Sequence, residues 1–186
     1  DFSLQTVLNS DKRLVACWTG ELLACHQAAA EFLRTQATVA NPGTFELVLA
    51  SAGGHPFDIN LVQAHKAVVN AAQFLRPRGT LILVAECGAG VGSWGLEQSL
   101  EYANPEVLYR RLRQEFVLNG NTALSLLLHA RKYRLILVSD LPPEWLRRLG
   151  IVPAEGLEEA LHQATKHSSP ERILILPDAA HAVVAN

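Results

Sequence analysis

The stretch FELVLASAGGHPFDINLVQAHKAVVNAAQFLRPRGTLILVAECGAGVG, residues 45–92, decides the fold of this chain. It holds two short apolar runs, FELVLA (45–50) and TLILVA (80–85), on either side of a helical pattern over residues 61–75. Short apolar runs that alternate with amphipathic helices are typical of parallel strands buried on both faces. The stretch therefore predicts a strand–helix–strand unit whose two strands end at the same edge of a sheet.

The same alternation continues on both sides of this unit. Upstream, residues 2–18 predict an antiparallel hairpin and the alanine-rich residues 20–36 predict a helix. Because the strands alternate with helices, we predict an α/β fold with three layers, a mostly parallel sheet, helices on both faces and an N-terminal β-hairpin. The elements expected downstream are helices within 96–102 and 105–117, helix 122–132, strand 134–139, helices 144–149 and 156–167, and strand 172–176.

Composition and charge limit the classes of partner. Hydrophobic residues make up 49% of the chain, charged residues 18%, and the formal net charge is −2, so nothing favours binding to nucleic acid or to an anionic membrane surface. No apolar run approaches the roughly 20 residues of a membrane-spanning helix. Three cysteines without CxxC spacing predict neither a disulfide framework nor a zinc site. We expect a cytoplasmic protein with a small-molecule ligand.

Ligands of parallel sheets bind at the carboxyl ends of the strands. Gly53 and Gly54 allow the backbone to approach a ligand closely there, and Glu86, which ends an apolar run, should face it. Asp58 or Asn60 can cap the following helix, whose amino end attracts an anion such as a carboxylate. The segments expected to gather at this edge are SAGGHPFDIN (51–60), ECGAGVGSWG (86–95) and SDLPPE (139–144).

The helix predicted over residues 61–75 has one polar face. Gln63, Lys66 and Asn70 follow one another at helical spacing on it, while apolar residues line the opposite face. Gln63 and Lys66 can therefore reach the ligand together. From spacing alone, the commoner alternative is that both belong to a solvated face of an amphipathic helix.

Residues Gly90 to Gly95 match the pattern GxGxxG of dinucleotide-binding proteins. That motif needs its first glycine directly after a strand and an acidic residue about 20 positions on, at the end of the next strand. Here Gly90 comes after the end of the apolar run at Ala85 and four further residues, and Glu115 lies in a helical stretch. The context favours a flexible glycine loop, with a Rossmann-like nucleotide-binding module as the alternative.

Taken in order, these motifs resemble the C-terminal domain of the nickel-dependent lactate racemase family. The resemblance extends over nearly the whole chain and is most specific in residues 45–92. Val62 departs from it, because several members are expected to have an aromatic residue there. The matching motifs are SAGG (51–54), DIN (58–60), Q-x-x-K (63–66), the turn GT (79–80) and AEC (85–87).

This resemblance implies a 2-hydroxyacid racemase or epimerase, in which a nickel-pincer nucleotide takes a hydride from the α-carbon of a small anionic 2-hydroxyacid and returns it to either face. It implies that Lys66 and Gln63 are the catalytic residues, Lys66 as the cation beside the substrate and Gln63 as an orienting hydrogen-bond partner. The substrate-binding residues expected beside them are Ser51, Gly53, Gly54, His55, Asp58 and Glu86.

The resemblance also implies that residues 1–186 are one α/β domain, the C-terminal part of a larger two-domain protein. The N-terminal domain would hold the cofactor, the nickel ligand and the acid/base histidines, so we expect no cofactor or metal site in these residues and no activity of the isolated domain. An apolar patch near the hairpin should contact that partner domain. A non-catalytic interaction domain that retains the fold is the remaining alternative. Cys87 is expected to be a partly buried cysteine and not a reactive thiol.

Overall fold

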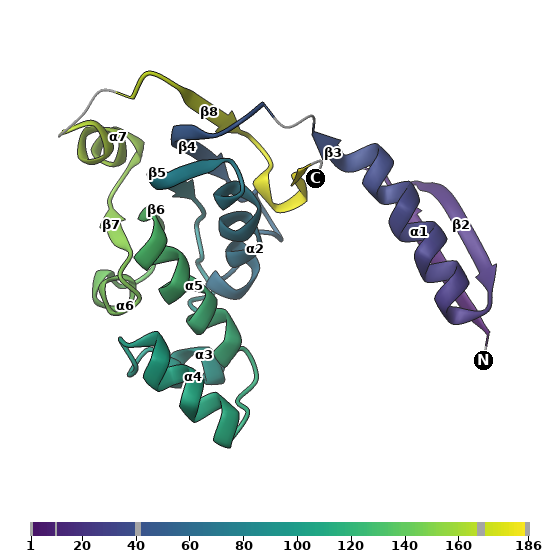
Figure 1. Ribbon diagram of the computed structural model, residues 1–186, viewed down its shortest axis with the longest axis horizontal. Coiled ribbons are helices and arrows are strands. Elements are labelled where there is room, and N and C mark those ends of the chain that lie inside the picture. The colour runs from purple at the N-terminus through teal and green to yellow at the C-terminus, as the bar shows by residue number, and fades with distance from the viewer. Residues whose placement is uncertain (1, 10, 40–41, 167–169, 185–186) are drawn as a thin grey trace. The chain divides into compact units, whose positions relative to one another are not determined.

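A five-stranded parallel sheet with the order β7-β6-β5-β4-β8 forms the centre of residues 41–182 (Figure 1). The computed structural model describes residues 2–9, 11–39, 42–166 and 170–184. Every pair of neighbouring strands in this sheet is parallel, so all of the strands end at one edge. The strands are β4 (Phe45–Ser51), β5 (Leu75–Val84), β6 (Arg134–Val138), β7 (Val152–Ala154) and β8 (Ile173–Leu176).

Both faces of the sheet are buried beneath helices. On one face, Leu81 of β5 packs against α2 (Leu61–Ala72) and α5 (Gly120–Lys132). On the other face, Ile82 packs in a cluster with Ala160 of α7 (Leu157–Thr165). Successive residues of a strand point to opposite faces, so a continuous apolar run is needed when both faces are covered. The predicted three-layer α/β fold with a parallel sheet is confirmed.

Most element boundaries lie within a few residues of those predicted. The main difference concerns β5, which begins at Leu75 and not at Thr80, because Leu75 already pairs with Phe45 of β4. For that reason α2 ends at Ala72, before the predicted end at Leu75. The short strand β7 was not predicted. The remaining elements of residues 41–182 are α3 (Trp94–Ser99), α4 (Pro105–Gln114), α6 (Pro143–Arg148) and a 3-10 helix, η1 (Ala179–His181).

Residues 1–40 and 183–186 form a second compact unit. Its antiparallel hairpin confirms the predicted one, and Trp18 of the hairpin packs edge-on against Phe32 with ring centres 5.4 Å apart. Large apolar side chains are exposed on the hairpin, among them Leu4, Leu8, Leu14 and Val15. The elements of this unit are β1 (Ser3–Leu8), β2 (Leu14–Gly20), α1 (Leu22–Ala37), β3 (Thr38–Val39) and β9 (Val183–Val184).

None of the helices in the described parts of the chain combines the length and the apolar character needed to cross a membrane.

Candidate functional site

A hollow of about 280 Å³ lies at the carboxyl edge of the parallel sheet. The three segments predicted to gather at this edge all contribute to it, because β4, β5 and β6 end side by side. A hollow is therefore present at the edge of the sheet where the strand order predicts a ligand cleft. The polar residues lining the hollow are Ser51, Asp58, Glu86, Ser139, Asp140 and Glu155, and Gly54 lies among them.

The hollow is acidic. Four of its lining residues, Asp58, Glu86, Asp140 and Glu155, have carboxylate side chains, and the described residues that line it include no Lys, Arg or His. Such a surface offers hydrogen-bond acceptors and a negative potential, which suit hydroxyl groups or cations better than a carboxylate. Ser51, Gly54, Asp58 and Glu86 are thus brought together, but in a hollow that repels the carboxylate of an anionic substrate.

Cys87 lies directly after Glu86 and is not a reactive thiol. Only 1% of its surface is exposed. Burial, together with the nearby charges of Asp58, Asp140 and Glu86, raises the pKa of its thiol to about 12. The thiol therefore stays protonated at neutral pH, and a protonated thiol is a poor nucleophile and metal ligand.

The amino end of α2 is fully capped by the chain itself. Asn60 is the cap residue, and its Oδ1 accepts a hydrogen bond from the amide of Gln63 at 3.0 Å. The amides of Leu61 and Val62 donate to the carbonyls of Gly90 and Val91, at 3.1 and 3.2 Å. A helix end binds an anion through amides that have no other partner. The prediction that this end attracts a carboxylate is therefore wrong.

The glycine-rich loop is the partner of that helix end. At Gly92, with a φ of 82°, a Cβ atom would lie 2.3 Å from the Asn60 side chain, so the loop approaches the cap as closely as glycine allows. Upstream in the loop, the amides of Cys87 and Ala89 donate to the carbonyls of Asp58 and Ile59. These hydrogen bonds and the close contact at Gly92 hold the loop against the start of α2, so the structure gives the loop glycines a packing role.

Gln63 and Lys66 lie together on the polar face of α2. The Nζ atom of Lys66 donates a hydrogen bond to Oε1 of Gln63 at 2.7 Å. Lys66 is exposed and Gln63 is half-buried. Neither side chain is among the described residues that line the acidic hollow. The structure therefore separates the carboxylates of the hollow from this exposed cation.

His65 lies between these two residues in sequence and faces α5. Its Nε2 atom lies 2.8 Å from Oγ of Ser125, a residue of α5. Burial, with a smaller contribution from the neighbouring His129, lowers its pKa to about 4. A residue next to Lys66 is rotated by about 100° around the helix, so His65 was expected to face away from the polar face.

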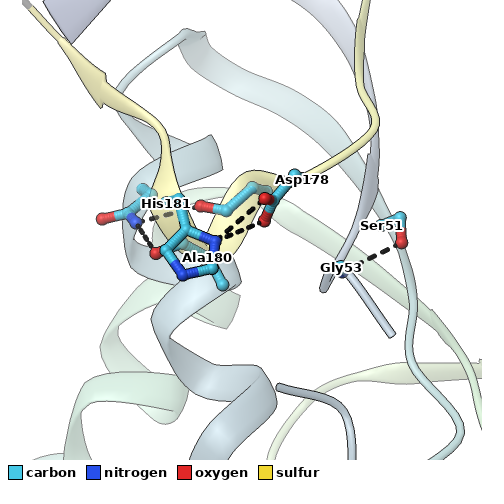
Figure 2. A network of polar contacts seen from close by, with 7 residues as sticks. Ser51, Gly53, Asp178, Ala180 and His181 are labelled. Atoms are coloured by element: carbon cyan, nitrogen blue, oxygen red, sulfur yellow. Dashed lines mark hydrogen bonds and ion pairs between the residues drawn. The ribbon is translucent and has the colours of Figure 1, made fainter. Parts of the chain in front are cut away.

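Gly53 and His55 lie on the loop that follows β4. The amide of Gly53 donates to Oγ of Ser51 at 3.1 Å (Figure 2). Gly53 has a φ of 100°, and a Cβ atom there would lie 2.7 Å from Oδ1 of Asp178. The side chain of His55 is exposed.

Sequence analysis overlooked a carboxylate–imidazole pair beside this loop. Nδ1 of His181 lies 2.9 Å from each carboxylate oxygen of Asp178 (Figure 2). The imidazole contacts Phe57 edge-on, with ring centres 4.4 Å apart. The available signal was the spacing D-x-x-H directly after an apolar strand. Within the described residues, no group of three or more His, Cys, Asp or Glu side chains is placed to hold a metal ion.

The solved structures show the same architecture. The structure of the lactate racemase apoprotein from Thermoanaerobacterium thermosaccharolyticum matches with a TM-score of 0.89 and 27% identity, over 100% of this chain and 46% of that chain. A protein from Thermotoga maritima has a similar fold, with a TM-score of 0.66 and 12% identity.

Sequence comparison leads to the same family. Lactate racemase from Lactiplantibacillus plantarum is 25% identical over 98% of this chain and 45% of its own length, and that of Thermoanaerobacterium thermosaccharolyticum is 27% identical over 98% and 44%. This chain thus spans somewhat less than half the length of the curated relatives it matches. Residues 40–184 match the model of the lactate racemase C-terminal domain. The chain therefore belongs to the family of lactate racemase C-terminal domains.

Proposed function

We propose that this chain is the C-terminal domain of a 2-hydroxyacid racemase or epimerase of the lactate type, and that Lys66 binds the carboxylate of the substrate. The observation that supports this most directly is the hydrogen bond between Lys66 and Gln63 on the polar face of α2, in a chain of this family. The relatives that share the domain are lactate racemases.

The geometry of the pair suits an anionic oxygen ligand. A lysine ammonium has three N–H donors, and Lys66 uses one of them on Gln63, which leaves two for a carboxylate. Because Oε1 of Gln63 accepts that bond, the amide nitrogen of Gln63 is left as a donor for a second ligand oxygen. The pair therefore presents donors, whereas the acidic hollow presents acceptors.

The cofactor that the family resemblance implies is a nickel-pincer nucleotide, which would supply hydride-accepting chemistry. The described residues of this chain do not fit that group. They include no cluster of metal-binding side chains, the hollow is acidic, and the amides at the amino end of α2 are occupied. We therefore assign the cofactor to the remainder of a longer protein, and we expect the isolated 186 residues to be inactive.

That remainder is also the partner we propose for the hairpin. Leu4, Leu8, Leu14 and Val15 of the hairpin are each more than half exposed. Exposed apolar surface commonly marks a contact with another domain. We propose that the racemisation site lies between this domain and the remainder of the longer protein, and that the whole protein is cytoplasmic.

The test is turnover of D- and L-2-hydroxyacids by the full-length protein loaded with cofactor. Loss of a hydrogen bond to a charged group costs roughly 1.5–3 kcal/mol, so Lys66→Ala should lower kcat/KM by about 10- to 100-fold. Lys166→Ala, which removes an exposed lysine after α7, is the matched control and should leave turnover unchanged. Equal turnover by the native protein and Lys66→Ala would contradict the assignment. No turnover of any hydroxyacid by a loaded and folded protein would favour the interaction-domain alternative.

A further inference from the structure

A second hollow, of about 360 Å³, lies between the last turns of α2 and of α5. Two of its lining residues fix its place in the fold, because Gln73 lies just before β5 and Tyr133 directly precedes β6. The hollow therefore lies near the amino ends of these strands. The acidic hollow lies at the opposite edge of the sheet and shares no described lining residue with it.

The charge of this hollow is opposite to that of the acidic one. Lys132 contributes an ammonium group, and the described residues that line the hollow include no Asp or Glu. The Nζ atom lies 5.0 Å from the centre of the Tyr133 ring, a contact that holds the ammonium against the wall of the hollow. Within the described residues Lys132 forms no ion pair, whereas the neighbouring Arg131 is paired with Glu106. Its three N–H donors are thus available to an anion.

The rest of the hollow is largely apolar. Val69 and Ala72 of α2 face Leu128 of α5 across it, and Leu128 is 52% exposed. Leu128 also lines a neighbouring hollow of about 490 Å³ between α4 and α5, to which Leu124 contributes. Because residues four positions apart lie on one side of a helix, Leu124, Leu128 and Lys132 form a single stripe along α5. Apolar surface therefore extends away from the ammonium group.

His129 forms a fixed part of the wall. Its Nδ1 donates to the carbonyl oxygen of Ser125 at 2.7 Å, and its ring stacks against Tyr133 with ring centres 6.4 Å apart. These contacts hold the aromatic side of the hollow in place before any ligand binds. A preformed wall lowers the entropy lost on binding.

We propose that this hollow binds a medium-chain monocarboxylate, with the carboxylate at Lys132 and the hydrocarbon chain against Val69 and Leu128. The ligand class follows from the chemistry of the wall, because one unpaired cation and an apolar surface match an anion with an apolar body. This binding site goes beyond the proposed function. It involves neither Lys66 nor the acidic hollow.

The test compares sodium hexanoate with 1-hexanol, which has the same chain length and no charge. Titration of the full-length protein, followed by its valine and leucine methyl resonances, gives the Kd of each. Lys132→Gln should weaken hexanoate binding by about 3- to 10-fold and leave hexanol binding unchanged. Lys166→Gln, which replaces the exposed lysine after α7, is the matched control and should change neither Kd.

Two further variants locate the ligand. Leu128→Ala should weaken hexanoate and hexanol alike, by about 3- to 5-fold, because both lose contact with the same apolar side chain. Lys66→Ala should leave the Kd measured at the Val69 methyl groups unchanged, which separates this site from that of the proposed function.

Three results would overturn the proposal. The first is no binding of hexanoate to the native protein, and the second is binding that shifts only methyl resonances outside α2 and α5. The third is a Lys132→Gln protein that binds hexanoate with the native Kd, or that loses hexanol binding to the same extent. None of these results bears on Lys66, whose role is tested by hydroxyacid turnover.

Discussion

The partly buried imidazole of His65 should make the stability of the parallel-sheet unit depend on pH. His65 lies between α2 and α5, where its Nε2 is 2.8 Å from Oγ of Ser125. Nδ1 of His129 lies 3.4 Å from the same hydroxyl and 2.7 Å from the Ser125 carbonyl oxygen. Protonating His65 would place a charge in this interface beside a second imidazole, which the packing disfavours.

The sign and size of the effect follow from the pKa. Burial lowers the pKa of His65 from 6.5 to about 4, so between these values the unfolded chain binds a proton that the folded chain does not. The contribution is fully present above pH 6.5 and is lost as the pH falls toward 4. One pKa unit corresponds to about 1.4 kcal/mol, so the free energy of unfolding should fall by about 3 kcal/mol across this window.

The assay is urea unfolding at pH 7.5 and pH 4.5, followed by amide resonances of residues 41–182. His65→Gln retains a donor for Ser125 but does not titrate, so its stability should depend less on pH, by about 2–3 kcal/mol over this range. His162→Gln, which replaces an exposed histidine of α7, is the control and should behave as the native chain does. If His65→Gln showed the native pH dependence in full, the burial argument would be refuted.

Three further predictions concern stability and are measured by urea unfolding at pH 7.5. Gly92→Ala should lower the free energy of unfolding by about 2–4 kcal/mol, because the added Cβ atom would displace the side chain of the Asn60 cap. Gly90→Ala is the control: a Cβ atom there meets no atom within 4 Å, so this variant should lose only about 1–2 kcal/mol, from its φ of 72°. Equal losses in the two variants would argue against the contact with the cap. Leu126→Ala should lower the free energy of unfolding by about 2–5 kcal/mol, because the Leu126 side chain is fully buried. Leu128 lies in the same helix but is 52% exposed, so Leu128→Ala should change the free energy of unfolding by no more than about 0.5 kcal/mol. A larger loss in Leu128→Ala than in Leu126→Ala would contradict the packing of α5. Asn104→Ala should cost about 1 kcal/mol, because its Oδ1 accepts the amides of Glu106 and Val107 at the start of α4, and an unchanged stability would show that water replaces this cap.

Local sequence patterns were sufficient for most of the elements. The runs FELVLA and TLILVA are apolar at every position, or nearly so, because strands β4 and β5 are covered on both faces. The meeting of Ser51, Glu86 and Asp140 was also predictable, because parallel strands end at one edge. β7 was missed because three residues, Val152–Ala154, are too short for a period to be recognised.

Other features depend on residues that are distant in sequence. Whether the amino end of α2 is open or closed is decided by Gly90 and Val91, which lie about 30 positions downstream and whose carbonyl oxygens accept hydrogen bonds from its first amides. The protonated state of Cys87 depends on burial and on Asp58 and Asp140, which belong to other loops. The pairing of Asp178 and His181 is visible as a spacing, but their proximity to Gly53 and Asn70 follows from the parallel pairing of β8 with β4.

The sequence by itself determined the alternation of strands and helices, the edge at which polar loops gather, and the polar face of α2 that holds Gln63 and Lys66, because these features depend on the spacing of neighbouring residues. Only the tertiary structure decided which amides and side chains at that edge remain available to a ligand. Hydrogen-bond partners and burial are set by chain segments far apart in sequence, and their arrangement exists only after the sheet has formed.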